Sequence, residues 1–285
     1  MSFAERAREL PRLGLGVSTE YGATNTPGAL DPMALRARVP LGFLEVGVET
    51  AKGLDDHAAN WIEAGLATTY HFLDLNLDEP EDLDDRWLFE LDALLARMEP
   101  AWLCGDAGLW HFGARDRGHM LLLPPVLTDD SARAMADGIR ALRAHTGREV
   151  IPENPPGAFY LGDLHLLDFY ARLADYADTG LLLDLAHLAI YQRTRGGSPT
   201  DGLDGFPLDR IVEMHVAGGR AMRTPDGFAF VDDDHSLGVL DEVWPLLERV
   251  APNAPNLKAV VLECERNPLD AVLPLFDRIA AVVAR

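Results

Sequence analysis

The stretch GLLLDLAHL, residues 180–188, places an unbroken apolar run directly before Asp184 and His187. Its leucines leave no polar face, which is typical of a parallel strand that is buried on both sides. Seven other short apolar runs share this design, and they alternate with longer amphipathic stretches. This alternation predicts repeated strand–helix units around a parallel sheet.

Eight such units predict a single (β/α)8 TIM barrel that occupies residues 1–285 as one α/β domain. The expected strands are LGLGVST (13–19), FLEVGVE (43–49), ATTYHFL (67–73), AWLCGDA (101–107), EVIPEN (149–154), GLLLDLA (180–186), IVEMHVA (211–217) and AVVLECE (259–265). The clearest helices are expected over 83–98, 128–145, 164–176 and 269–283. The sixth unit is the weakest, because RTRGGSPTDGLDGF (193–206) predicts a long loop with little helix.

The charge balance argues against several classes of partner. The chain has 25 Lys and Arg residues against 46 Asp and Glu residues, a formal net charge of −21. A chain this acidic repels phosphate backbones and anionic lipid, so neither a nucleic-acid nor a membrane partner is expected. The first residues lack the apolar core of a signal peptide, and no later stretch suits a membrane span, which predicts a cytoplasmic protein. Cys104 and Cys264 lie in apolar runs and are expected to be buried free thiols.

Acidic and imidazole side chains follow nearly every expected strand at its carboxyl end. Because the active site of such a barrel is built at those ends, these side chains are expected to converge. Carboxylates buried together repel one another and lose their hydration unless cations neutralise them, so the pattern predicts bound metal. The residues are Glu49, His71, Asp106, Glu153, Asn154, Asp184, His187, His215 and Glu263, followed in the loop 231–236 by Asp232, Asp233, Asp234 and His235.

The mixture of imidazole and carboxylate ligands favours iron, manganese or zinc over a structural zinc site or a calcium loop. The set exceeds the needs of one ion, which favours two or three. The remaining histidines divide into two groups. His57, His145 and His165 are expected on the outer helices, whereas His111 and His119, in the loop after the fourth strand, stay open as ligands or substrate contacts. Glycines in AGGRAMRTPDG (217–227) suggest a mobile loop beside the site.

The order and spacing of these motifs resemble the multinuclear non-haem iron-dependent oxidases, the family of the methanobactin biosynthesis oxidase. The resemblance runs over nearly the whole chain. Its stretches are LEVGVET (44–50), YHFLDLNL (70–77), the segment 122–155 from LLPP to ENP, LLLDLAHL (181–188), IVEMHVAGG (211–219), FVDDDHSLGVLDEVWPLLERV (230–250) and VVLECER (260–266).

The resemblance implies which residues hold iron or touch the residues that do. It places Glu49 in the pocket, and it favours Asp233 over its two neighbours because the family pattern is Asp-x-His. The implied iron ligands, or residues in contact with them, are His71, Asp106, Glu153, Asn154, Asp184, His187, His215, Asp233, His235 and Glu263.

Departures from the family pattern concern the number of ions and the substrate. The family reads Ser-Asp-His after the fourth strand, but this chain has Gly105, Asp106 and Ala107, so a customary imidazole is absent. Either His111 or His119 replaces it, or the site holds two ions instead of three. At two other positions, His187 supplies a ligand where the family has Asn, and Gly219 stands where the family has His. These changes indicate a divergent subgroup.

Members of the family oxidise residues of ribosomally made peptides, commonly cysteine, with dioxygen at iron, often with a partner protein that presents the peptide. The resemblance therefore implies an iron-dependent oxidoreductase with Fe2+/Fe3+ ions, dioxygen as co-substrate and a peptide substrate. Two alternatives stay open. One is a divalent-metal sugar isomerase or phosphodiesterase of the xylose-isomerase-like barrels, and the other is a non-catalytic barrel that binds a partner.

Overall fold

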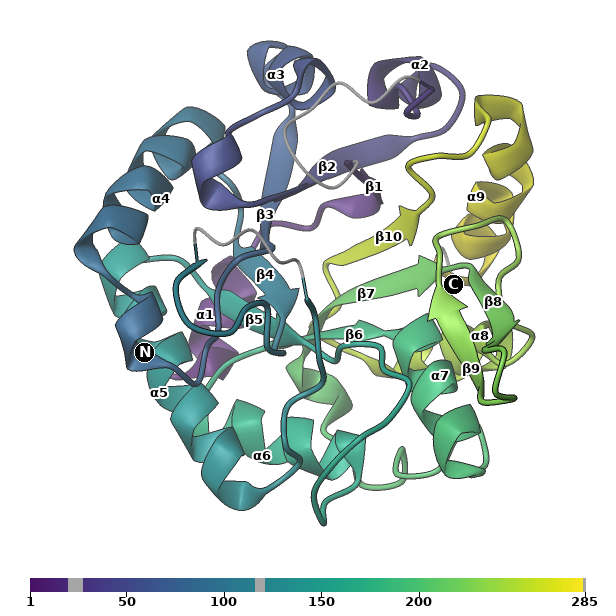
Figure 1. Cartoon of the computed structure of the whole chain (residues 1–285). Coiled ribbons are helices and arrows are strands. Elements are labelled where there is room, and N and C mark those ends of the chain that lie inside the picture. The colour runs from purple at the N-terminus through teal and green to yellow at the C-terminus, as the bar shows by residue number, and fades with distance from the viewer. Residues whose placement is uncertain (20–27, 116–120, 284–285) are drawn as a thin grey trace.

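The computed structural model describes residues 1–19, 28–115 and 121–283. Eight parallel strands close into a barrel in the order β1-β10-β7-β6-β5-β4-β3-β2, which confirms the (β/α)8 fold class (Figure 1). All eight overlap the strands expected from the sequence. Their bounds are β1 (Gly14–Ser18), β2 (Leu41–Val48), β3 (Ala67–Phe72), β4 (Leu103–Asp106), β5 (Val150–Glu153), β6 (Leu181–Asp184), β7 (Ile211–Ala217) and β10 (Ala259–Glu263).

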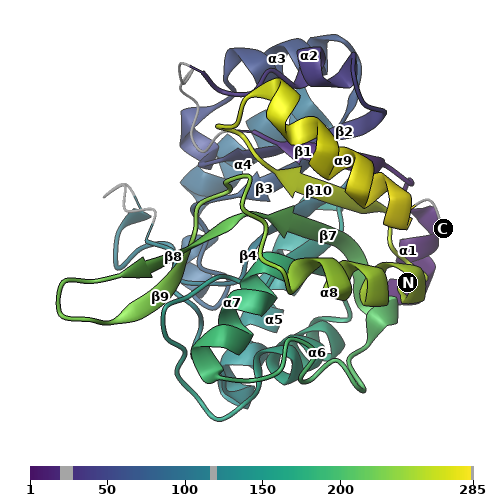
Figure 2. The ribbon, with the colours of Figure 1, turned by 90° about the vertical axis from the view of Figure 1, so that its right-hand side faces the viewer.

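Helices surround the barrel, and a short one covers the end at which the strands begin (Figures 1 and 2). That short helix is α1 (Phe3–Glu9). The surrounding helices are α2 (Pro32–Arg36), α3 (Asp56–Glu63), α4 (Asp85–Met98), α5 (Asp129–Thr146), α6 (Leu166–Ala177), α7 (Leu185–Arg195), α8 (Val243–Val250) and α9 (Leu269–Val283). Single 3-10 turns are η1 (Thr50–Lys52), η2 (Pro80–Asp82), η4 (Leu208–Arg210) and η5 (Ala251–Asn253).

The α5 helix shows how the sequence sets its own limits. The Thr128 side chain accepts a hydrogen bond from the Ser131 backbone N–H, and Gly147 ends the helix in the left-handed conformation. Between them Met135, Ile139 and Leu142 form a buried stripe. The four helices expected most clearly, at 83–98, 128–145, 164–176 and 269–283, are confirmed as α4, α5, α6 and α9.

The loop expected over 193–206 is present beyond Arg195, but a helix that was not expected precedes it. The α7 helix begins directly after β6, and only the residues beyond Arg195 form the loop. Asp184 ends the strand and caps this helix, because its side chain accepts a hydrogen bond from the His187 backbone N–H at 2.5 Å. Leu185 through Gln192 are all buried, so the helix has no polar face and lacks the amphipathic period by which a helix is recognised.

A β-hairpin replaces the mobile loop expected over 217–227. Strands β8 (Gly219–Arg223) and β9 (Ala229–Asp233) pair antiparallel and project from the end of the barrel opposite α1 (Figure 2). Gly218 belongs at the base of the hairpin because a Cβ there would lie 1.8 Å from the Ser236 carbonyl oxygen. The hairpin places Asp233 over the carboxyl ends of the barrel strands.

The barrel interior is built in layers by the alternation of each strand. The end at which the strands begin is the lower end of the barrel, and the end at which they finish is the upper end. At the lower end, the buried side chains of Phe43, Trp102, Ile151 and Val261 pack together and against Phe3 of α1. A second apolar cluster fills the space between the strands and the surrounding helices. None of the described helices has the length and apolar character needed to cross a membrane.

Candidate metal centre

Histidines and carboxylates from most of the barrel converge above the apolar layer, as the sequence predicts. The strands β3, β4, β5, β6, β7 and β10 each contribute one residue within two positions of its carboxyl end. The helix α7, the strand β9 and the residue at 235 add the rest. All but Asp233 are buried. The residues are His71, Asp106, Glu153, Asp184, His187, His215, Asp233, His235 and Glu263.

Glu153 lies at the centre of this cluster and links three imidazoles. Its Oε2 lies 2.7 Å from His71 Nε2. Its Oε1 lies 3.3 Å from His215 Nδ1 and 3.4 Å from His187 Nδ1. Since Glu153 is the last residue of β5 and is 1 % exposed, its position is fixed by the barrel wall.

Asp233 and His235 close the cluster from the hairpin side. Asp233 Oδ2 lies 2.9 Å from His187 Nε2 and 3.3 Å from His235 Nε2. The neighbouring aspartates, Asp232 and Asp234, instead pair with Arg220 at 3.7 and 3.4 Å. Thus only Asp233 of the three acids joins the cluster. His235 has a φ of 49°, an uncommon left-handed conformation for a non-glycine residue.

The second nitrogen of His235 contacts Glu265, an acid that was not among the expected site residues. His235 Nδ1 hydrogen-bonds Glu265 Oε2 at 2.9 Å, and Ser18 donates a hydrogen bond to the other oxygen of that carboxylate. The pairing of a ring nitrogen with a carboxylate fixes the orientation of an imidazole, as it does for histidines that bind metals. His235 therefore has a defined orientation toward the cluster.

Several polar atoms of the cluster carry no hydrogen bond within the described part of the chain, although each is buried. Such atoms are costly in a native protein unless an ion or water satisfies them. Their donor chemistry, carboxylate oxygen with imidazole nitrogen, fits a divalent cation. The atoms are Asp106 Oδ1, Glu153 Oε1, Asp184 Oδ2, His215 Nδ1, Asp233 Oδ1 and Glu263 Oε2.

The cluster contains overlapping trios whose ligand atoms lie within 4.8 Å of one another. Glu153 belongs to two of these trios, and Glu263 also belongs to two. Shared carboxylates are what a site for several neighbouring ions requires, since a carboxylate has two oxygens to offer. The trios are His71–Asp106–Glu153, Glu153–Asp184–His187, Glu45–His215–Glu263 and His235–Glu263–Glu265.

Without a bound cation, the surroundings of the cluster raise the pKa values of His71, Asp184 and Asp106 and so favour their protonated forms. Burial opposes the charging of His71, but its hydrogen bond to Glu153 and the nearby acids outweigh this and raise its pKa to about 9. Burial, with repulsion from Glu263 and Glu153, raises the pKa of Asp184 to about 7. Burial and Glu153 also raise the pKa of Asp106. A cation would displace these protons, because metal ligands bind in their deprotonated forms.

A pocket of about 470 Å³ opens onto the cluster. Its base includes Asp106, Glu153 and His187, and its wall includes Phe230 of the hairpin and Trp110. The volume lies within the ordinary range for small-molecule sites, so it can admit one or two side chains of a larger substrate.

Two predicted site residues have other contacts. Asn154 binds the backbone of Asp184 with both ends of its amide, accepting from N–H and donating to C=O at 2.9 Å each. Asn154 therefore holds β6 in place beside the cluster. The structure does not bring Glu49 to the cluster; its carboxylate pairs with Lys52 at 2.5 Å and lines a separate hollow with Trp87 and Arg115.

Among the residues that the structure describes, none replaces the imidazole that is missing beside Asp106. His111 hydrogen-bonds Asp82 at 2.9 Å through Nε2 and the Gly113 carbonyl oxygen at 2.8 Å through Nδ1, so both nitrogens are occupied away from the cluster. These contacts do not support His111 as a ligand. His119 lies outside the described residues. Ala107 is buried among apolar side chains.

The three outer histidines stay away from the cluster. His57 lies near Asp31, at 3.8 Å, and His145 hydrogen-bonds Asp92 at 2.9 Å. His165 caps α6 and meets the Tyr191 ring edge-on. The prediction that these three histidines lie on the outer helices or at their ends is confirmed.

Three buried acids near the cluster were missed: Glu45, Glu213 and Glu265. Acids of the site were expected only at strand ends, whereas Glu45 and Glu213 lie inside otherwise apolar strands. The missed signal is alternation, because residues two apart on a strand face the same side. Glu213 lies two residues before His215, and Glu265 two residues after Glu263.

The barrel is similar to solved structures of xylose isomerase-like proteins. A xylose isomerase domain-containing protein of Salmonella typhimurium matches with a TM-score of 0.59 and 12% identity, covering 97% of this chain and 99% of that chain. A xylose isomerase-like TIM barrel protein of Mycobacterium smegmatis, solved with magnesium, matches with a TM-score of 0.58 and 13% identity, covering 97% of each chain. At such low identity the likeness shows the fold alone.

Sequence relatives are found among bacterial proteins of the UPF0276 group. One from Bordetella bronchiseptica is 30% identical over 285 residues, covering 96% of this chain and 93% of the relative. One from Acaryochloris marina is 31% identical over 233 residues, covering 80% and 79%. The family model described as "RiPP precursor modification enzyme MbnB/TglH/ChrH" matches residues 28–283. The motifs that built the buried cluster thus lie within that match, and the chain belongs to the MbnB/TglH/ChrH family of RiPP precursor modification enzymes.

Proposed function

We propose that this chain is a multinuclear non-haem iron oxidase that uses dioxygen to modify a residue, commonly cysteine, of a ribosomally made peptide. The observation that carries the proposal is the set of buried cluster atoms without hydrogen bonds in the described chain, whose oxygen and nitrogen donors bound cations would satisfy together. Family membership supports a peptide substrate, because the family acts on RiPP precursors. Resemblance to the iron oxidases supports iron and dioxygen.

The ligand chemistry is consistent with this proposal. The cluster atoms at the carboxyl ends of the strands are imidazole nitrogens and carboxylate oxygens, a combination that suits ferrous and ferric iron. His71, Asp106 and Glu153 would hold one ion, and Asp184 and His187 would hold a second that shares Glu153. A third place is offered by His235, Glu263 and Glu265, whose ligand atoms also lie within 4.8 Å of one another.

Iron bound here would supply a Lewis acid for the substrate and electrons for dioxygen. The protein's part is to hold its ligands rigidly and to position the substrate. Asn154 fixes the backbone of Asp184, and Asp233 orients His187 through a 2.9 Å contact. The apolar layer below the cluster excludes water from that side, so the substrate must approach through the pocket.

Exposed apolar side chains lie on chain segments that also contribute residues to the pocket. The loop after β5, the segment after β4 and the hairpin carry large apolar residues that are 37–59% exposed, and the same segments supply Ala158, Trp110 and Phe230 to the pocket. Exposed apolar surface of this kind supports a peptide substrate. The residues are Phe112, Val126, Phe159, Leu161, Met222 and Phe228.

The experiment is purification without oxygen, followed by metal analysis and reconstitution with Fe2+. The reconstituted protein is then mixed with a Cys-bearing precursor peptide, with and without its presenting partner, and oxygen uptake and peptide mass are recorded. The proposal expects at least two irons per chain and oxygen uptake that depends on the peptide.

The opposite results would distinguish the alternatives. Turnover of a sugar or phosphodiester that ignores oxygen and runs with Mg2+, Mn2+ or Zn2+ would replace the oxidase proposal with an isomerase or phosphodiesterase. Binding of the peptide without any metal uptake would identify a non-catalytic barrel.

A further inference from the structure

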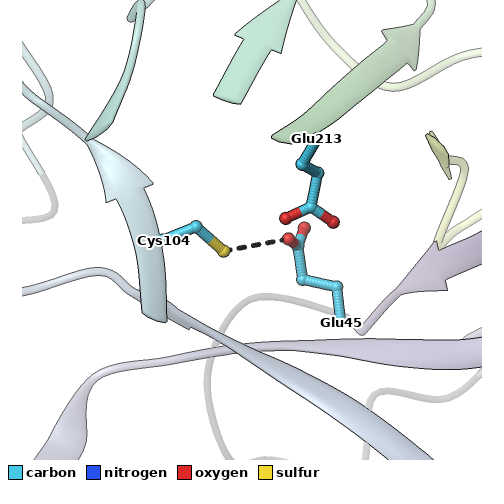
Figure 3. A group of neighbouring side chains, drawn as sticks. All are labelled: Glu45, Cys104 and Glu213. Atoms are coloured by element: carbon cyan, nitrogen blue, oxygen red, sulfur yellow. Dashed lines mark hydrogen bonds between the residues drawn. The ribbon is translucent and has the colours of Figure 1, made fainter. Parts of the chain in front are cut away.

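Beneath the metal centre the barrel interior contains a second polar layer. Glu45 of β2, Cys104 of β4 and Glu213 of β7 point toward one another at the barrel centre (Figure 3). Their ligand atoms lie within 4.8 Å of one another, and Cys104 Sγ lies 3.2 Å from Glu45 Oε2. None of the three is more than 1 % exposed. Barrel interiors usually fill this layer with branched apolar side chains, so three ionisable groups here need a cause.

Two buried oxygen atoms in or beside this layer have no hydrogen-bond partner among the described residues. Glu213 accepts a hydrogen bond from Trp102 Nε1 at 2.7 Å through Oε2, but its Oε1 has no hydrogen-bond partner among the described residues. Figure 3 shows that the Glu213 carboxyl group faces Glu45. Thr69 Oγ1 also has none, and Thr69 pairs in register with Glu45 on the neighbouring strand. A buried oxygen without a hydrogen-bond partner destabilises a folded protein, and more so where the group is charged.

The positive charge next to this layer is too small to satisfy it. His215 Nε2 lies 3.2 Å from Glu45 Oε1, but the same ring also faces Glu153 and Glu263 through Nδ1, at 3.3 and 3.4 Å. The His215 ring is thus directed to Glu153 and Glu263 on one side and to Glu45 on the other, and it makes no contact with the free Oε1 of Glu213.

We propose that Glu45, Cys104 and Glu213 form a second, inner metal site for one divalent transition ion, such as Zn2+ or Fe2+. A thiolate with two carboxylates is a donor set for a borderline ion, and neither Ca2+ nor Mg2+ takes thiolate. His215 Nε2 lies 3.2 Å from Glu45 Oε1, where it can donate a hydrogen bond to this ligand of the inner ion. This site differs from the upper centre in its thiolate and in its depth.

The inner ion would act on the structure of the site, with no part in the reaction. It would neutralise Glu45 and Glu213 of this second polar layer and hold the Glu45 side chain in place. The contact of Glu45 with His215 in turn orients that imidazole toward the upper cluster. The inner site rests on its own residues, and its ligand set does not depend on the substrate proposed above.

The test uses Co2+ as a spectroscopic probe on the full chain. Metal is removed with a chelator and Co2+ is added stepwise. A cobalt–thiolate bond gives an intense near-ultraviolet absorption that carboxylate and imidazole ligands alone do not give. The inner site predicts this absorption in the unmodified protein and its loss in Cys104→Ser, together with one metal equivalent per chain by elemental analysis. In Glu213→Gln the affinity for that equivalent falls about tenfold or more.

The chain contains a matched control in its other buried thiol. Cys264 packs in the outer cluster between strands and helices, whereas Cys104 belongs to the interior. Cys264→Ser should therefore keep the absorption, and His71→Ala should keep it while losing metal from the upper centre. All four substitutions are close in shape or remove bulk, and circular dichroism checks that each variant folds.

Two results would overturn the inner site. One is a metal-loaded protein without thiolate absorption, and the other is an unchanged metal count in both Cys104→Ser and Glu213→Gln. Failure of the upper centre looks different, because the thiolate absorption would then be present while the protein takes up only one ion.

Discussion

At the lower end of the barrel, Phe43, Trp102 and Val261 fill the interior and pack against Phe3 of α1. At the upper end, the same strands β4 and β10 place Asp106 and Glu263 in a buried acidic cluster. Burial of apolar side chains at the lower end stabilises the fold, whereas repulsion between the buried acids at the upper end destabilises it. Stability and chemistry are thus separated along the axis of one barrel, as is general for this fold.

The β5 strand contains this contrast within five residues. Glu149, just before the strand, is buried and paired with Arg6 at 2.6 Å, so its charge is balanced within the protein. Glu153, at the end of the strand, faces three imidazoles and has an oxygen without a hydrogen bond in the described chain. The difference shows that a buried acid by itself does not identify a site; an unsatisfied buried acid among imidazoles does.

The largest effect is expected from removing the central carboxylate. Glu153→Gln keeps the shape of the side chain but removes the charge that two trios share. Metal affinity at the upper centre should fall by more than about 100-fold, and turnover with it, since removing an outer partner alone costs 10- to 100-fold. Elemental analysis and oxygen uptake measure the two losses.

The control for this change is Glu149→Gln, at the residue just before the same strand. It breaks the buried pair with Arg6 and should lower the free energy of unfolding by about 3–5 kcal/mol, while the metal content of the folded protein stays unchanged. If Glu149→Gln removed metal as effectively as Glu153→Gln, the division between the two ends would be wrong.

The next largest effect belongs to the apolar end. Phe43 is fully buried, so Phe43→Ala should leave a cavity and cost about 3–5 kcal/mol of unfolding free energy. Denaturant unfolding of the metal-loaded protein measures the loss. Because Phe43 lies in the apolar layer, metal per folded chain should not change. Loss of metal from folded protein would show that the two layers are coupled.

Much of this division can be predicted from the sequence, because both ends leave patterns along the strands. Runs such as residues 181–184 are apolar until the last position, and a barrel brings such last positions to one end. His71, Asp106, Glu153 and Asp184 could therefore be placed together before any coordinates.

The errors also have physical causes. The α7 helix was missed because it is buried all round, so its sequence has no polar face to give a helical period. The hairpin of β8 and β9 was taken for a loop because glycines in 217–227 resemble flexible turns, although Gly218 is required by the close approach of Ser236.

Partner choice within the site could not be predicted from the sequence. His111 and His187 both follow strand ends. The Nε2 atom of His111 contacts Asp82, away from the cluster, whereas the Nε2 atom of His187 contacts Asp233 within it. These contacts depend on loop geometry that no local pattern determines. Glu45 was missed for a different reason, because only strand ends were searched for acids.

A moderate effect is expected from pH on the metal-free protein. The folded pKa of His71, about 9, exceeds its ordinary value of 6.5, so its stabilising contribution is present below pH 6.5 and is lost as pH rises through 9. The folded pKa of Asp184, about 7, exceeds 3.8, so its contribution is lost as pH rises through 7. Both signs agree: stability should fall by about 1 kcal/mol or more between pH 6 and pH 9.

Metal should abolish this dependence, because cations hold the deprotonated forms. Thermal melting of chelated and loaded protein at both pH values measures it, and the gain in Tm from metal should be larger at pH 9. Asp184→Asn should weaken the dependence of the metal-free protein. An equal gain in Tm at both pH values would mean that the cluster does not exchange protons for metal.

The smallest effect is expected at the outer edge of the upper end, where Phe228 stacks near Phe230 beside the pocket. Phe228 is 49% exposed, so Phe228→Ala should change the unfolding free energy by no more than about 0.5 kcal/mol. If the peptide lies over the hairpin, KM for the peptide should rise about 3- to 10-fold with kcat unchanged, because binding is lost equally from substrate and transition state.

The matched control is Phe89→Ala on α4. It removes an aromatic side chain that is 75% exposed on one of the outer helices. Equal KM values for the two variants would place the peptide elsewhere, since the two rings differ chiefly in their distance from the cluster end.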